Sequence, residues 1–136
     1  MAASPGRTAG RVGMVGGGQL ARMTAQAAVP LGVGLTVLDP DPDPPAAQAG
    51  ARVLVGRPDR LDDLVALAEA TDVVTVDHER VSLEHLRALE DLGHRVAPGW
   101  AVAELAFDKA ASRRRLRDHG FPVPRFTPAA TVADVV

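Results

Sequence analysis

The chain has 136 residues, of which 46% are hydrophobic and 24% charged, a balance typical of a folded globular protein. A formal net charge of −2 excludes the strongly basic character of a nucleic-acid-binding protein. The absence of cysteine excludes a disulfide scaffold, a cysteine nucleophile and a thiolate zinc site. No apolar run reaches the roughly eighteen residues of a membrane span, and residues 1–10 lack the apolar core of a secretion signal. We therefore expect a cytoplasmic enzyme, or part of one, without nucleic-acid or membrane partners.

Five short apolar runs predict buried β-strands. They are Arg11–Val15, Val33–Leu38, Arg52–Val55, Asp72–Val76 and Arg95–Ala97. Helical patterns of about ten residues lie between most of these runs: Gln19–Val29, the segment after Asp59, and the segment from Ser82 to Gly93. This alternation predicts an α/β fold, a Rossmann-like doubly wound parallel sheet with helices on both faces.

Spacing and capping residues refine the expected helices. In the first helix, Leu20, Met23 and Ala27 or Ala28 lie at helical spacing and form the expected apolar face. We expect Asp59 and Ser82 to cap the next two helices. The expected inward residues are Leu61, Leu64, Val65, Leu67 and Ala68 in the second helix, and Leu83, Leu86 and Leu89–Leu92 in the third.

Composition divides the chain into three parts. We expect residues 1–10 to form a flexible tail, residues 11–100 the α/β domain, and residues 101–136 linker helices that open a second domain. Two helices are expected there, at Ala101–Ala106 and Asp108–His119, and a third begins near Thr131. The remainder of that second domain is expected outside these residues.

A glycine-rich turn follows the first predicted strand. Gly16-Gly17-Gly18-Gln19-Leu20-Ala21 matches G-x-G-x-x-G/A at the start of a helix, where free amide hydrogens and the helix dipole favour a phosphate. The alternative is a tight strand–helix turn without a ligand. Asp39, twenty-one residues after Gly18, stands where a dinucleotide-binding protein places its ribose-binding acid.

Polar residues also follow the fourth predicted strand. The segment Thr75–Val81 includes Asp77, Glu79 and Arg80, at the sheet edge where ligands bind in open α/β folds. The alternative is a solvated loop with ion pairs of its own. Lys109, the single lysine among fifteen basic residues, is a candidate for a chemical role or a chance surface residue.

Four segments resemble the amino-terminal part of the 5-(carboxyamino)imidazole ribonucleotide synthases, a family of ATP-grasp ligases in purine biosynthesis. The segments are VGMVGGGQLARM (12–23), AVPLGVGLTVLDPDPDPPAAQ (28–48), DVVTVDHERV (72–81) and FDKAASRRRLRDHGFPVP (107–124). The resemblance implies a preATP-grasp domain at 11–100 followed by the beginning of an ATP-grasp domain, truncated at 136. It also implies a homodimer for the full-length protein.

The resemblance further implies an activity and a site. The family cleaves ATP to ADP and phosphate, with Mg²⁺, to join bicarbonate to aminoimidazole ribonucleotide through carboxyphosphate. By resemblance, the backbone amides of Gly17, Gly18, Gln19 and Leu20 receive the 5′-phosphate, Asp77, Glu79 and Arg80 lie beside the ribonucleotide, and Lys109 contacts ATP. Val76, Asp77, Arg80 and Phe107 depart from the family pattern.

Most ATP and Mg²⁺ contacts are expected outside this chain, so we expect residues 1–136 alone to be inactive. Two other hypotheses remain open on the sequence. One is an NAD(P)-binding Rossmann-fold protein that uses the same glycines with Asp39. The other is a non-catalytic assembly module.

Overall fold

A computed structural model describes residues 10–76, 78–129 and 131–134. The chain divides into two units, Met1–Trp100 and Ala101–Val136, and each is described by itself. No helix in the described part of the chain is both long and apolar enough to cross a membrane.

The first unit is built on a four-stranded parallel sheet. Its strands are β1 (Arg11–Val15), β2 (Gly34–Asp39), β3 (Arg52–Val55) and β4 (Val73–Val76), in the order β3-β2-β1-β4. Val15 pairs with Leu38 on one side and with Val76 on the other, so three strands end at the same edge.

The predicted fifth strand at 95–97 is wrong. Val96 makes only an isolated parallel bridge with Val74, carried by bonds from Val74 N to Arg95 O and from Ala97 N to Val74 O. Pro98 follows at once and has no amide hydrogen with which to continue a ladder.

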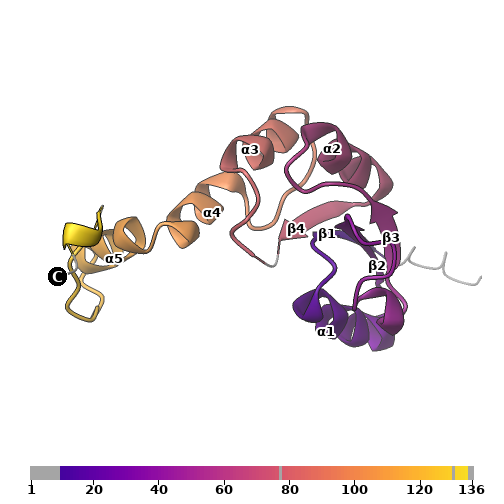
Figure 1. The fold of residues 1–136 in the computed structure, drawn as a ribbon, viewed down its shortest axis with the longest axis horizontal. Helices are drawn as coiled ribbons and strands as arrows, with labels where there is room; N and C mark the ends of the chain where they lie inside the picture. The colour runs from indigo at the N-terminus through magenta and orange to yellow at the C-terminus, as the bar shows by residue number, and fades with distance from the viewer. Residues whose placement is uncertain (1–9, 77, 130, 135–136) are drawn as a thin grey trace, which may run out of the picture. The chain divides into compact units, whose positions relative to one another are not determined.

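Helices cover both faces of the sheet, which confirms the doubly wound α/β fold. Helix α1 (Gln19–Ala28) lies on one face, and α2 (Leu61–Ala70) and α3 (Leu83–Asp91) lie on the other (Figure 1). Short 3₁₀ turns at Val29–Leu31 (η1) and Ala47–Ala49 (η2) complete the α1 side.

The predicted apolar face of α1 is correct at Ala28, which is buried, and wrong at Leu20 and Met23. Leu20 and Met23 are 57% and 63% exposed, whereas the buried residues of the helix are Ala21, Ala25 and Ala28. Small side chains let the helix axis approach the sheet closely, and Ala21 and Ala25 share a core cluster with Met14, Leu35 and Val37. The two larger residues are left on the outer side.

The opposite face is a leucine-rich layer. The buried residues of its helices are Leu64, Leu67 and Ala68 in α2 and Leu86 and Leu89 in α3, as predicted. Leu61, Val65 and Leu83 are only half-buried, and Leu92 is 61% exposed, so its predicted inward position is wrong.

The predicted caps of these helices differ from the observed ones. Arg60, and not Asp59, is the N-cap of α2, because the Asp59 carboxylate accepts from Arg57 Nε and Nη2 at 2.9 and 2.6 Å. Ser82 is the N-cap residue of α3, but its side chain makes no cap hydrogen bond.

The remaining helices are α4 (Trp100–Phe107), α5 (Lys109–Asp118) and the 3₁₀ turn η3 (Val132–Asp134). Gly120 follows α5 with a φ of 80°. Where a helix start is predicted near Thr131, the Asp134 carboxylate accepts from the Thr131 backbone nitrogen at 2.8 Å and its hydroxyl at 3.0 Å.

Candidate functional site

The carboxyl ends of β1 and β4 form the position in this sheet that is best suited to a ligand. The chain leaves β1 through α1 on one face and leaves β4 towards α3 on the other (Figure 1). Adjacent parallel strands whose connections leave on opposite faces open a crevice at their carboxyl ends, where ligands bind in open α/β sheets. The glycine-rich turn and the loop after β4 both start at this edge.

The glycine-rich turn is closed on its inner side by the protein itself. Gly16 has a φ of 101°, which favours glycine, and its amide donates to Leu38 O at 2.9 Å. The Gly17 amide donates to Asp39 Oδ2 at 2.8 Å, and Gly17 O accepts from Ala46 N at 2.9 Å. The expectation that the Gly17 amide is free for a phosphate is therefore corrected.

The outer side of the turn remains open. In the described part of the chain, the amides of Gly18, Gln19 and Leu20 donate no hydrogen bond to the protein. Gly18 is the N-cap of α1, and the first turn of the helix holds no acidic side chain that would compete for the amides. A Cβ on Gly18 would meet nothing within 4 Å. Three adjacent donors at a helix N-terminus can hold one phosphate group.

The loop after β4 brings further polar groups to this edge. Asp77 lies outside the described residues. His78 is half-buried and its Nδ1 accepts from Arg80 N at 3.2 Å, whereas the side chains of Glu79 and Arg80 are exposed. Within the described residues neither Glu79 nor Arg80 forms an ion pair.

Asp39 does not stand as a free ribose-binding acid. Its Oδ2 accepts from Gly17 N and its Oδ1 from Asp41 N, at 2.8 and 2.9 Å. Pro44, from the proline-rich loop that follows, is fully buried, and a Cβ on Gly17 would lie 2.7 Å from its Cβ. The loop therefore covers the part of the turn that a dinucleotide would need to approach, which disfavours the NAD(P) hypothesis.

The sequence does not reveal this covering loop, because the contacts that place it join residues far apart in the chain. Gly17 and Asp39 are 22 positions apart. The only signal in the sequence is the proline run itself, which indicates a rigid loop but not where it packs.

Lys109 belongs to the second unit. It is the first residue of α5, is exposed, and donates from Nζ to Ala106 O at 3.1 Å. The preceding residue, Asp108, caps the helix by accepting from Ala110 N and Ala111 N at 2.8 and 2.9 Å. In the part of the chain that the structure describes, this neutral carbonyl is the one acceptor of the amine.

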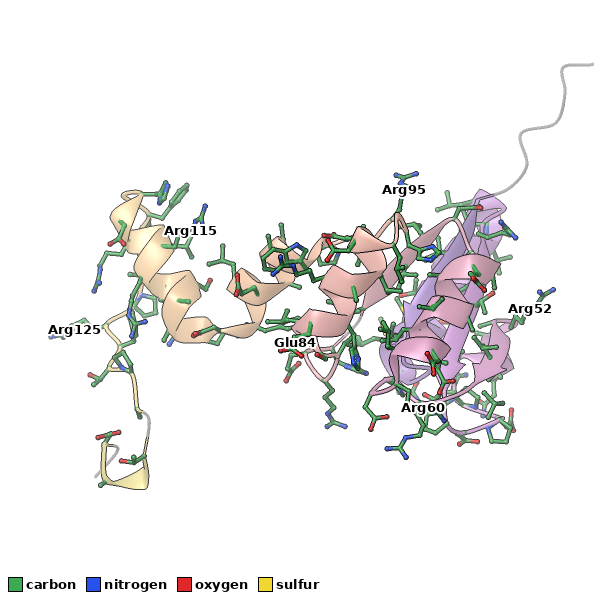
Figure 2. All side chains as sticks on the ribbon, turned by 90° about the horizontal axis from the view of Figure 1, so that it is seen from above. Arg52, Arg60, Glu84, Arg95, Arg115 and Arg125 are labelled. Atoms are coloured by element: carbon green, nitrogen blue, oxygen red, sulfur yellow. The ribbon has the colours of Figure 1, made fainter. Side chains whose placement is uncertain are left out.

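Nothing in the described residues fits a magnesium site. Groups of three or more His, Cys, Asp or Glu side chains that could hold a metal ion are absent from residues 10–76, 78–129 and 131–134. The arginines of α5 are also not arranged around an anion. The Cζ atoms of Arg113 and Arg117 lie 5.6 and 5.8 Å from the centre of the Phe126 ring. The side chain of Arg115 is exposed (Figure 2).

Comparison with known proteins agrees with the geometry. Residues 9–106 match the model of the ribonucleotide synthetase preATP-grasp domain. The chain is 42% identical over 123 residues to the N5-carboxyaminoimidazole ribonucleotide synthase of Corynebacterium ammoniagenes, which is 90% of this chain and 30% of that protein.

Solved structures show the same similarity. The N5-carboxyaminoimidazole ribonucleotide synthetase of Thermotoga maritima matches with a TM-score of 0.80 and 28% identity over 93% of this chain and 35% of that one. The synthase of Aspergillus clavatus, in complex with ADP and 5-aminoimidazole ribonucleotide, matches with a TM-score of 0.77 and 30% identity over 87% of this chain and 31% of that one.

The match is to one part of these proteins, since the chain spans about 30% of the length of the curated relative. Within that part, the family match covers the sheet, the glycine-rich turn and the loop after β4. The chain therefore belongs to the ribonucleotide synthetase preATP-grasp domain family.

Proposed function

We propose that this chain is the amino-terminal, ribonucleotide-binding part of an N5-carboxyaminoimidazole ribonucleotide synthase. The full-length enzyme would use ATP and bicarbonate to carboxylate 5-aminoimidazole ribonucleotide, with carboxyphosphate as the intermediate and ADP and phosphate as products. The relatives that carry this name, and the Aspergillus clavatus complex with ADP and 5-aminoimidazole ribonucleotide, support the proposal. The observation that carries it is the row of three amides at the beginning of α1 that donate no hydrogen bond within the described residues.

The phosphate of the ribonucleotide would sit against the amides of Gly18, Gln19 and Leu20. A phosphate needs several donors at once, and a helix N-terminus supplies them together with a favourable dipole. The Gln19 side chain is exposed beside these amides and offers one further donor. Gly17 would contribute by allowing the loop to pack closely, and not through its amide.

The base and ribose would extend towards the loop after β4. Glu79 is exposed there without an ion-pair partner among the described residues, which leaves its carboxylate available to accept hydrogen bonds from the ligand. Arg80 is exposed beside it, and Asp77 belongs to the same proposed set.

ATP would be held mainly by residues outside this chain, with Lys109 as the contact supplied here. The Lys109 ammonium is exposed and, among the described residues, bound to a neutral carbonyl alone, so it can turn to a phosphate oxygen at small cost. Mg²⁺ would also be bound outside the described residues. We include a cytoplasmic homodimer in the proposal for the full-length protein.

The test uses Glu79→Gln in the full-length protein, with Glu84→Gln as the matched control. Glu84 lies in the first turn of α3, and its side chain is exposed (Figure 2). We expect Glu79→Gln to weaken the binding of 5-aminoimidazole ribonucleotide about tenfold in calorimetric titration, since a hydrogen bond to a charged group is lost. Glu84→Gln should bind like the unaltered protein. Equal affinity for all three proteins would remove Glu79 from the site, and an unaltered protein that does not bind the ribonucleotide would refute the proposal itself.

A further inference from the structure

Asp39 holds the glycine-rich turn by two charged hydrogen bonds at once. One carboxylate oxygen accepts from Gly17 N at 2.8 Å and the other from Asp41 N at 2.9 Å. Asp39 is the last residue of β2 and pairs with Val55 of β3, and its carbonyl accepts from Gly56 N at 3.1 Å, so its backbone is fixed by the sheet. The carboxylate therefore links a rigid strand end to the turn and to the first part of the proline-rich loop.

The same loop returns to the turn at its far end. Ala46 N donates to Gly17 O at 2.9 Å, and the fully buried Pro44 lies against Gly17. Gly17 thus donates a hydrogen bond to Asp39, accepts one from Ala46, and packs closely against Pro44. The next three residues are the ones whose amides donate no hydrogen bond within the described residues.

We infer that Asp39 is a positioning residue for phosphate binding, because its bond to the Gly17 amide fixes the direction in which the Gly18, Gln19 and Leu20 amides point. This inference rests on the proposed function, since it concerns the same phosphate site. Asp39 itself does not touch the phosphate. It lowers the entropy cost of binding, because the three amide donors are already ordered in the ligand-free protein.

Two substitutions in the same loop separate this role from a simple effect of charge. In Asp39→Asn the side chain has one carbonyl oxygen, so it can accept from Gly17 or from Asp41 but not satisfy both as the carboxylate does. In the described residues the Asp41 side chain accepts one hydrogen bond, from Asp43 N to its Oδ1. The single carbonyl oxygen of the asparagine in Asp41→Asn can accept the same bond. Each substitution removes one negative charge, which by itself favours phosphate slightly.

The first measurement follows the amides of the ligand-free chain by NMR. Asp39→Asn should shift the Gly17, Gly18, Gln19 and Leu20 amide resonances and speed hydrogen exchange at Gly17. Asp41→Asn should leave these four resonances in place. Unchanged resonances in Asp39→Asn would overturn the inference, whatever the ligand does.

The second measurement compares 5-aminoimidazole ribonucleotide with the corresponding nucleoside, which lacks the phosphate. We expect Asp39→Asn to weaken ribonucleotide binding about tenfold and to leave nucleoside binding unchanged, whereas Asp41→Asn binds both like the unaltered chain. Equal weakening for both ligands indicates general loss of structure and overturns the positioning role. If the unaltered chain binds neither ligand, the proposed function fails, and the amide resonances still decide whether Asp39 orders the turn.

If Asp39→Asn does not fold, two other measurements still test the role of Asp39. Asp39→Ser removes the carboxylate with a smaller side chain and gives the same predicted shifts. Hydrogen exchange in the unaltered chain needs no variant: the Gly17 amide should exchange more slowly than the Gly18 amide. Equally fast exchange at the two positions would contradict the bond to Asp39.

Discussion

Pro44 lies so close to Gly17 that position 17 has no room for a side chain. A Cβ there would stand 2.7 Å from Pro44 Cβ, 2.8 Å from Pro44 Cγ and 3.1 Å from Asp39 Oδ2. Pro44 is fully buried and rigid, so it cannot turn aside as a flexible side chain would. The turn and the covering loop therefore fold as one packed unit.

Gly17→Ala should for this reason destabilise the first unit. Overpacking of a close contact costs about 1–3 kcal/mol, and we expect a loss of that size in the free energy of unfolding measured with urea. A variant as stable as the unaltered chain would show that the loop does not pack on Gly17.

Gly18→Ala should change the stability little and weaken ribonucleotide binding. The added methyl group meets nothing within 4 Å in the protein, and Gly18 has a φ of −71°, which alanine adopts. We expect the free energy of unfolding to change by no more than about 1 kcal/mol, the cost of a poorer N-cap residue. Ribonucleotide binding should weaken strongly, because the methyl group stands beside the free amides.

Gly34→Ala is the matched control for Gly18→Ala. Gly34 begins β2, at the edge of the sheet away from the turn, and a Cβ there also meets nothing within 4 Å. Its ribonucleotide affinity should equal that of the unaltered chain. Normal affinity in Gly18→Ala would place the phosphate elsewhere.

The strands were the most predictable part of the fold, for a physical reason. Arg11–Val15 and Arg52–Val55 are observed with their predicted bounds. A short apolar run bounded by turn residues is a local pattern, and it was enough to locate even the edge strand β3, whose residues are half-buried or exposed. The outward-facing Leu20 and Met23 could not be predicted, since periodicity shows that a helix has faces but not which one lies against the sheet.

The sequence also predicts one part of the candidate site and not another. Its position at the end of β1 follows from a local pattern of glycines before a helix. The role of Asp39 does not, because a carboxylate at the end of β2 has the same sequence signature whether it binds a ribose or the Gly17 amide. Only the tertiary contacts with Pro44 and Ala46 distinguish the two.

Arg11 and Asp72 join the beginnings of β1 and β4 and should give the first unit a measurable acid dependence. The Arg11 side chain donates to Asp72 Oδ1 at 2.8 Å and its backbone nitrogen to Asp72 Oδ2 at 2.7 Å. These bonds, the side-chain one first, lower the pKa of Asp72. Because the folded pKa lies below the unfolded one, the stabilisation is present above about pH 4 and is lost as the pH falls through the folded value.

Asp72→Asn should therefore reduce the difference between urea midpoints measured at about pH 6 and about pH 3. The effect should be small, since both side chains are largely exposed. Asp62→Asn is the control, because the Asp62 carboxylate lies 3.9 Å from Arg60 and accepts no hydrogen bond in the described residues. An unchanged pH profile in Asp72→Asn would mean that the pair does not persist in solution.

Asp108 should stabilise the first turn of α5, the helix that begins with Lys109. Its Oδ1 accepts from Ala110 N and Ala111 N, so Asp108→Ala leaves two donors unpaired and costs α5 about 1 kcal/mol. We expect faster hydrogen exchange in the first turn of α5, with Asp108→Ser restoring most of the protection. Asp118→Ala, at the last residue of α5, should not reduce protection, because a negative charge there opposes the helix dipole.

The most direct measurement is a titration of the ¹⁵N-labelled 136-residue chain with 5-aminoimidazole ribonucleotide and, separately, with its nucleoside. We predict that the amide resonances of Gly18, Gln19 and Leu20 shift and saturate with the ribonucleotide and stay in place with the nucleoside. Binding of the ribonucleotide without any shift at these three amides would contradict a phosphate site at the beginning of α1.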